Sequence, residues 1–442
     1  MADREGLRLA LPDRLGFLRR KYLRLALALA LGLIVWRVVV AFDLGPLILS
    51  PPEATTSISA GTGLQTWAQA RRTPENTGYT PDAGPPSPGK VRWAYTTSEP
   101  ILASPAVVGN RVYLTTGDGR AVALERATGR TVWEHSTGVF TATTPAVAGD
   151  LVFFGLRNKR FIALDRETGE LRWEQDLGNP VLASAIVVDG TVYIGSTDKK
   201  LYALDAATGR KRWSFAKKGW IISTVAYADN SVAVASQDGV VHILEASTGR
   251  KRLVFNAGFP IIGGPAISGD AVYFVSNRGT VWSVDRHTVT YPFERAWWTV
   301  RGNLFAWGLL SDVPSQKGTL WGTNVGGRVL LSPAIADDTV YVADRNGNLH
   351  ALDAGTGEWL WTKEVATEIT ADPTVAGDTV LVGTDDGTLY GLDTATGEER
   401  WRFKTGGKIT AAPVTTYALD RVADAHRDIE SGNTVGKLIL VP

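Results

Sequence analysis

Apolar and polar residues alternate in short runs along most of the chain beyond residue 91. The runs Thr191–Ser196 (TVYIGS) and Leu201–Asp205 (LYALD) are typical, because β-branched and aromatic side chains are enriched in them and the pattern has a period of two. Such a period predicts β-strands rather than helices. No segment beyond Phe42 keeps a helical period, so we expect an all-β domain.

The runs recur at a fixed spacing. Four runs make a unit, and the third run of a unit ends in an acidic residue. These acidic residues are forty positions apart in all but one interval: Glu125, Asp165, Asp205, Glu245, Asp285, Asp353 and Asp393. Four-stranded units at this spacing are typical of β-propellers. Counting first runs, from Ala103–Val107 to Ala412–Val414, gives eight, so we predict an eight-bladed β-propeller over residues 91–442.

The two ends of this domain are expected to close the ring. Trp93 lies forty residues before Trp133, in the run 91–97, which has no preceding three runs of its own. The last unit ends in KLILVP at residues 437–442, without an obvious third run. We therefore expect 91–97 to act as a closing strand for the last blade.

A glycine and a tryptophan recur after the acidic residue of each unit. The glycine allows the positive φ of a tight turn, and the tryptophan follows four residues later. We predict that one indole ring packs between each pair of neighbouring blades, where truncating a buried tryptophan costs about 3–5 kcal/mol. Two units have Leu253 and Phe293 instead, which predicts looser packing there. The structural residues are Gly129, Gly169, Gly209, Gly249, Gly357 and Gly397, with Trp93, Trp133, Trp173, Trp213, Trp361 and Trp401.

The N-terminal part differs from the repeats. Five basic residues between Arg14 and Arg24 precede an apolar stretch at 25–42, which predicts a transmembrane helix with residues 1–24 in the cytoplasm and the propeller outside, in the periplasm or extracellular space. The alternative is a cleaved signal peptide ending near Ala41, which also exports the propeller. Residues 43–90 are rich in Pro, Ser and Thr and read as a linker, with one aromatic and basic island at 67–72.

Composition excludes several classes of function. The formal net charge of +1 gives no field that would attract nucleic acid. The absence of cysteine excludes disulfides, thiolate metal sites and a lipid-modified N-terminal cysteine. The five histidines are scattered, so none is a candidate zinc ligand. The segment Asp344–Asn348 lies at the hairpin position that recurs in every unit, so we predict an ordinary turn there rather than a calcium loop. We name no metal or catalytic residue. We expect the basic run around Lys217 and Lys251 to be a solvated rim.

The stretches Tyr202–Trp213 and His350–Trp361 resemble the repeat of the pyrroloquinoline-quinone (PQQ) propeller superfamily, in which Asp-x-x-Thr-Gly-x-x-x-Trp follows a strand. The superfamily contains quinoprotein dehydrogenases and non-catalytic BamB-type scaffolds. The resemblance implies a protein-binding scaffold of the cell envelope, with another envelope or exported protein as its partner and no cofactor. The alternative is a quinone-dependent (PQQ) dehydrogenase with calcium, although the disulfide that holds the quinone in those enzymes cannot form here.

One region, at about 290–330, has no counterpart in the repeats, because the interval from Asp285 to Asp353 contains 28 extra residues. One reading is that its aromatic residues cap the propeller's own face or plug its channel. The other is that they form a docking surface for a partner protein or a membrane, as tryptophan is enriched in both settings. The candidate partner-binding residues are Trp297, Trp298, Phe305, Trp307 and Trp321.

Overall fold

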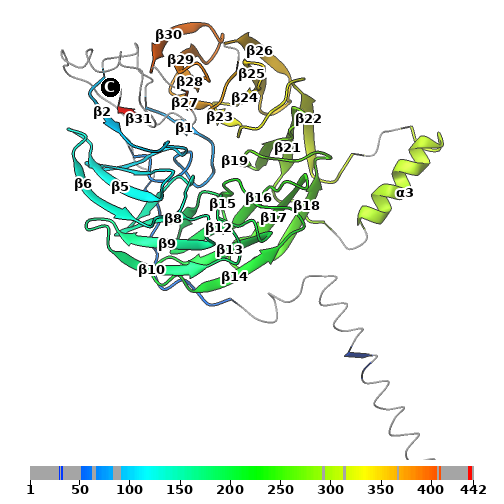
Figure 1. Cartoon of the computed structure of the whole chain (residues 1–442). Helices are drawn as coiled ribbons and strands as arrows, with labels where there is room; N and C mark the ends of the chain where they lie inside the picture. Colours follow the sequence, from blue (N-terminus) through cyan, green and yellow to red (C-terminus); the bar gives the residue numbers. More distant parts are fainter. Residues whose placement is uncertain are drawn as a thin grey trace, which may run out of the picture.

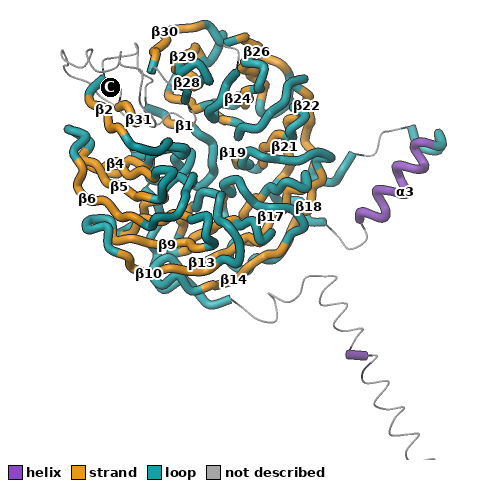
Figure 2. The backbone as a smooth tube through the Cα atoms, viewed as in Figure 1, coloured by secondary structure: helices purple, strands orange, loops and turns teal. Residues whose placement is uncertain are grey.

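The computed structural model describes residues 29, 31–32, 51–61, 66–82, 91–290, 294–311, 315–365, 368–405, 408–409 and 437–440. In this part of the chain, seven antiparallel blades of four strands each stand radially around a common axis, and a fifth strand, β1 (Tyr79–Thr80), is added parallel to the inner edge of the last blade (Figure 1). The protein is therefore an all-β propeller. Figure 2 shows the strands of the blades around the axis and the helix α3 set apart from them.

Each blade runs from an inner strand beside the axis to an outer strand at the rim, in chain order. The strands, blade by blade, are β3 (Ala106–Val108), β4 (Arg111–Thr115), β5 (Arg120–Glu125) and β6 (Thr131–Ser136); β7 (Ala146–Ala148), β8 (Leu151–Gly155), β9 (Arg160–Asp165) and β10 (Leu171–Asp176); β11 (Ile186–Val188), β12 (Thr191–Gly195), β13 (Lys200–Asp205) and β14 (Lys211–Ala216); β15 (Ala226–Ala228), β16 (Ser231–Val234), β17 (Val240–Glu245) and β18 (Lys251–Asn256); β19 (Ala266–Ser268), β20 (Ala271–Val275), β21 (Thr280–Asp285) and β22 (Thr319–Asn324); β23 (Ala334–Ala336), β24 (Thr339–Ala343), β25 (Asn348–Asp353) and β26 (Trp359–Glu364); β27 (Thr374–Ala376), β28 (Thr379–Gly383), β29 (Thr388–Asp393) and β30 (Glu399–Lys404).

The acidic residue that marks each repeat fixes the turn between the third and fourth strands. In blade 3, Asp205 Oδ1 accepts hydrogen bonds from the Thr208 backbone N–H at 2.9 Å and from the Thr208 hydroxyl at 2.7 Å. Gly209 follows with a φ of +70°, a conformation that favours glycine. The repeat motif is therefore a local turn whose geometry the side chains themselves determine.

The recurring tryptophans join neighbouring blades. Trp213 of blade 3 donates its indole N–H to the carbonyl of Ala246 in blade 4 at 2.9 Å. A Cβ on Gly249 would lie 2.7 Å from the Trp213 ring, so only glycine leaves room for it. The same contact recurs in the pairs Trp93 with Gly129, Trp133 with Gly169, Trp173 with Gly209, Trp321 with Gly357, and Trp361 with Gly397.

The position of Trp321 between two blades contradicts two predictions. The insertion interrupts the turn between β21 and β22, so the strand that carries the blade's tryptophan comes after it. Trp321 on β22 donates to the Ala354 carbonyl at 2.8 Å and is 8% exposed. Trp321 therefore holds the inter-blade position of blade 5 and is not part of an exposed docking surface. Phe293, to which the sequence pattern had assigned that position, lies outside the described residues.

The prediction of eight blades is wrong, because the described residues form seven four-stranded blades. The unit beginning at Ala412 lacks the Asp-x-x-Thr-Gly-x-x-x-Trp motif, and residues 410–436 lie outside the described part of the chain. What is described there is a two-stranded sheet, in which β2 (Trp93–Thr96) pairs antiparallel with β31 (Lys437–Leu440). The two ends of the domain thus meet beside blade 1, where Trp93 donates to the carbonyl of Arg126.

The prediction of a membrane-spanning helix, and of a location in the membrane based on it, is also contradicted. Among the residues that the structure describes, no helix combines the length and the apolar character needed to cross a bilayer. The predicted span at 25–42 lies outside the described residues, apart from Leu29, Leu31 and Gly32.

The segment read as a linker packs against the propeller where it is described. Residues 51–61 cross blade 3, where the Ile58 carbonyl accepts a hydrogen bond from Gly190 N–H at 2.7 Å and Thr55 binds the Asp205 carboxylate. Residues 66–80, which we call the clasp, then line the axis and include β1 (Tyr79–Thr80), which pairs parallel with β27. The sequence suggested a linker because residues 43–90 are rich in Pro, Ser and Thr and the clasp lacks the alternation of apolar and polar residues that predicts a strand.

The clasp covers the inner edge of every blade. The middle residue of each inner strand donates its backbone N–H to an acceptor in the clasp, and blades 1 to 7 are contacted in chain order. The seven bonds are Val107 to Trp67 O, Val147 to Ala68 O, Val187 to Gln69 Oε1, Tyr227 to Pro74 O, Ile267 to Glu75 O, Ile335 to Thr77 O and Val375 to Gly78 O, at 2.6–3.0 Å. An unpaired strand edge is thereby satisfied in each sheet.

Candidate functional site

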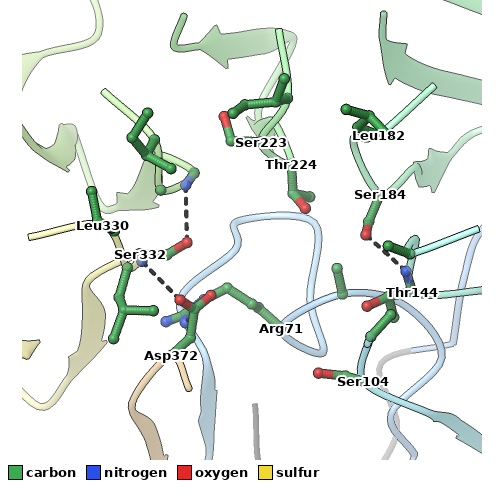
Figure 3. A pocket seen from close by; sticks show the side chains of 18 of the residues that line it. Arg71, Ser104, Thr144, Leu182, Ser184, Ser223, Thr224, Leu330, Ser332 and Asp372 are labelled. Carbon is green, nitrogen blue, oxygen red and sulfur yellow. Dashed lines mark hydrogen bonds and ion pairs between the residues drawn. The ribbon is translucent and has the colours of Figure 1, made fainter. Parts of the chain in front are cut away.

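A cavity of about 230 Å³ opens on the propeller axis, where the loops between blades reach the inner strands; we call it the axial funnel (Figure 3). Each blade contributes two residues to the funnel lining. One lies two positions before the first residue of the inner strand, and the other lies four positions before that first residue. The nearer residues are small and mostly polar: Ser104, Thr144, Ser184, Thr224, Gly264, Ser332 and Asp372. The farther ones are mostly aliphatic: Leu102, Ala142, Leu182, Ile222, Ile262, Leu330 and Thr370. The funnel therefore has a polar ring and an apolar ring.

The polar ring is held by hydrogen bonds between neighbouring blades (Figure 3). Ser184 Oγ accepts from Thr144 N–H, and Ser332 Oγ accepts from Gly264 N–H, both at 2.9 Å. Asp372 Oδ1 accepts from Ser332 N–H at 2.9 Å. The hydroxyls of Ser184 and Ser332 are thus positioned by the backbone of the adjacent blade.

Arg71 of the clasp lies in the funnel lining and is 4% exposed. Its guanidinium contacts the Asp372 carboxylate at 3.2 Å and donates to the carbonyls of Pro333 at 2.7 Å and Pro373 at 3.3 Å. It also donates to the carbonyls of Asn76 and Thr77 within the clasp. Burial lowers the pKa of Arg71 from its ordinary value, and the carboxylate of Asp372 opposes that shift. The charge of Arg71 is therefore matched inside the protein.

The funnel residues do not fit a quinone cofactor with calcium. Among the described residues that line the funnel, none is an aromatic residue on which a quinone ring could stack, and the carboxylate among them, Asp372, forms an ion pair with Arg71. In the described ranges no three His, Cys, Asp or Glu side chains are grouped as a metal site would require. The turn at Asp344 is an ordinary hairpin turn, in which Asp344 Oδ1 accepts from the backbone N–H of Asn346 and of Asn348, both at 2.9 Å.

The insertion forms a second candidate surface. It contains α3 (Glu294–Ala306), which projects away from the rim of the propeller between β21 and β22 (Figure 1). Trp297 is 62% exposed, Trp298 43% and Trp307 72%, while Phe305 is half-buried. Where it is described, the insertion neither caps the propeller face nor fills the channel. The helix was missed in the sequence because its residues, ERAWWTVRGNLFA, do not form a clear apolar stripe at helical spacing.

Lys217 follows β14 and does not lie on a solvated rim. Its ammonium donates to the carbonyls of Val234 at 3.1 Å and Val240 at 2.9 Å, which flank a hairpin of the next blade. Burial lowers the pKa of Lys217 to about 7, and Asp238 partly opposes the shift. The neighbouring His242 is half-buried, and desolvation together with the charge of Lys217 lowers its pKa as well.

Lys217 should make the stability of the protein depend on pH. Its folded pKa of about 7 lies below the ordinary value of 10.5, so between these values the unfolded chain holds a proton that the folded chain has released. The contribution of Lys217 to the free energy of unfolding therefore rises with pH through this window and is least favourable below pH 7. We expect Lys217→Met to remove this slope in urea titrations from pH 6 to 10, while Lys218→Met, at an exposed neighbour, keeps it. Parallel pH profiles for the wild type and Lys217→Met would contradict the assignment.

Sequence reasoning missed the funnel and the clasp. A partial signal for the funnel was present, since Leu-x-Ser recurs before an inner strand at 102–104, 182–184 and 330–332, although it also occurs in the insertion at 309–311. Without a structure these residues could not be assigned to the same face of the ring. Arg71 had no comparable signal, because its partners are mostly backbone carbonyls of distant residues.

Comparisons with known proteins agree with this architecture. No curated protein matches the chain. BamB from Moraxella catarrhalis superposes with a TM-score of 0.60 at 20% identity, over 74% of this chain and 92% of that one. The quinohemoprotein alcohol dehydrogenase of Comamonas testosteroni gives 0.64 at 15% identity, over 80% and 75%, and a europium-containing methanol dehydrogenase gives 0.65 at 14%, over 79% and 87%. At these identities the superpositions establish the fold and favour neither a scaffold nor an enzyme.

A family model gives the firmer result. The model described as outer membrane protein assembly factor BamB matches four times, at residues 83–159, 138–220, 216–304 and 307–436. Together these matches cover most of the chain and nearly all of the propeller, and they confirm the resemblance of the repeats to the PQQ-like superfamily. The chain therefore belongs to the BamB family of PQQ-like repeat propellers.

Proposed function

We propose that this chain is a protein-binding scaffold, and that α3 is the element through which it docks a partner protein. The family description supports this proposal, because it names an assembly factor for outer membrane proteins rather than an enzyme. The funnel supports it too, since its residues offer neither a stacking ring nor a metal site. The partner is expected to take part in the same kind of assembly.

The observation that carries the proposal is the exposure of tryptophan on a projecting helix and on the turn that follows it. Trp297, Trp298 and Trp307 are all more than 40% exposed, and α3 stands clear of the propeller (Figure 1). Large apolar groups on a monomer surface are uncommon unless they meet another molecule, and tryptophan is enriched among the residues that dominate binding energy. We take the occupant to be a partner protein with an apolar groove, into which the helix lies.

The double variant Trp298→Ser/Trp307→Ser tests the proposal. We expect it to reduce partner binding by roughly thirtyfold or more, because each truncated hot-spot residue typically costs about 2 kcal/mol or more. The melting temperature should stay within about 1 °C of the wild type, since substitutions of exposed residues change stability little. Binding is measured with a photo-crosslinking residue at position 301 of α3, followed by identification of the captured protein and titration of that protein against both forms.

Trp359→Ser serves as the matched control, because Trp359 is also about half exposed (48%) but lies on the outer strand of blade 6. It should leave crosslinking and affinity unchanged. Equal loss in the control, or full binding in the double variant, would reject α3 as the docking element. A collapse of the melt in the double variant would instead favour a structural role for the insertion.

A further inference from the structure

We propose that the axial funnel is a second binding site, which takes an uncharged, extended peptide segment with one aliphatic side chain. The site is separate from α3, so the inference adds to the proposed function without depending on the helix. It rests on the chemistry of the two funnel rings and on the way in which the propeller already holds a peptide along its axis.

The charges in the lining argue for a neutral ligand. The two charged groups of the funnel, Arg71 and Asp372, are 3.2 Å apart and neutralise each other. Every nitrogen of the Arg71 guanidinium already has an acceptor in the protein, so it has little capacity left for an anion. A cationic ligand would have to compete with Arg71 for the carboxylate of Asp372. A charged ligand therefore gains little here and loses its hydration.

The two rings argue for a ligand that is aliphatic and also forms hydrogen bonds. Leu182, Ile222, Ile262 and Leu330 are half-buried around the cavity and can enclose a branched aliphatic side chain. The polar ring adds hydroxyls, and Ser184 and Ser332 each use an oxygen lone pair to accept a backbone N–H, which leaves the hydroxyl proton for an incoming acceptor. A peptide supplies both parts, because its side chain is apolar and its amides carry acceptors and donors.

The clasp shows that the propeller axis suits a peptide backbone. Residues 66–80 are held by one N–H from each of seven blades, six of them to backbone carbonyls and one to the side chain of Gln69. Arg71 belongs to the clasp and also lines the funnel, so the occupied part of the axis and the open part adjoin. The volume of about 230 Å³ is sufficient for a short stretch of chain and not for a folded domain.

The experiment uses the full chain with labelled Ile and Leu methyl groups and follows their NMR signals during titration. The probes are acetyl-Ser-Leu-Ser-amide, the same peptide with Asp or Lys in the centre, and maltose as a neutral polyol. We expect saturable shifts of the Ile222 and Ile262 methyls with the leucine peptide, with a Kd of about 1 mM for so small a ligand. The Asp and Lys peptides and maltose should bind at least tenfold more weakly.

Two variants locate the site. Ile222→Ser should weaken binding of the leucine peptide at least fivefold, while Leu320→Ser, at an exposed leucine on the outer strand of blade 5, should leave it unchanged. The inference is overturned if the Ile222 and Ile262 methyls show no saturable shift, if charged peptides or maltose bind equally well, or if exposed leucines such as Leu320 shift as much as the funnel does. None of these outcomes affects the α3 proposal, whose test measures a different surface and a different ligand.

Discussion

Trp213→Ala is expected to lower the free energy of unfolding by about 3–5 kcal/mol, the cost of truncating a large buried aromatic residue. Trp213 is 7% exposed and lies between blades 3 and 4, against Gly249. The substitution creates a cavity at this boundary and also removes the indole donor from the Ala246 carbonyl. The midpoint and slope of a urea transition, followed by circular dichroism, measure the change.

Trp307→Ala provides the control, because the same side chain is removed from a position that is 72% exposed. Its effect should stay within about 0.5 kcal/mol. If the two variants unfold at the same urea concentration, the recurring tryptophans do not hold the blades together, and the inter-blade hydrogen bonds of the funnel would have to carry that role.

Arg71→Met should also be strongly destabilising, by about 3 kcal/mol, because it leaves the half-buried Asp372 without its counter-charge and several buried carbonyls without a donor. Methionine keeps much of the volume but supplies no donor. Asp372 then loses its counter-charge, and the carbonyls of Pro333 and Pro373 lose the group that joins blades 6 and 7 to the clasp. The urea transition again gives the magnitude.

The double variant Arg71→Met/Asp372→Asn separates the ion pair from the carbonyl contacts. It should recover part of the lost stability, since residues in direct contact are not additive. Arg130→Met is the surface control, because Arg130 is 79% exposed and lies 3.9 Å from Glu125. A loss of less than 1 kcal/mol in Arg71→Met would show that the clasp is held without its guanidinium.

Much of the fold could be predicted because the repeat encodes it locally. Asp205, Thr208 and Gly209 form a turn through their own side chains and backbone, so the motif can be read without knowing what lies next to it. The blade count failed for the opposite reason. The unit at the C-terminal end lacks the motif, and what the structure describes there is one pair of strands from the two ends of the domain.

The candidate sites were less accessible to sequence reasoning. The funnel is formed by residues about forty positions apart, such as Ser184 and Thr144, that meet only after the ring has formed. The clasp binds mainly through its backbone carbonyls. Every residue type has a backbone carbonyl, so such contacts cannot be recognised from the sequence. The tryptophans of the insertion were visible as a departure from the repeat, and the structure separated Trp321, which is buried between blades, from Trp297, Trp298 and Trp307 on the projecting segment.

The clasp has a consequence for the order in which the protein can be completed. Its residues leave the ribosome before any blade does, yet its contact at Gly78 needs Val375, almost 300 residues later. Blades can assemble from their own local hairpins as they emerge, but the backbone groups of the clasp stay partly unpaired until the seventh arrives. The clasp can therefore be fully paired only after the seventh blade has been synthesised, and a chain truncated before that blade should leave part of the clasp backbone unpaired.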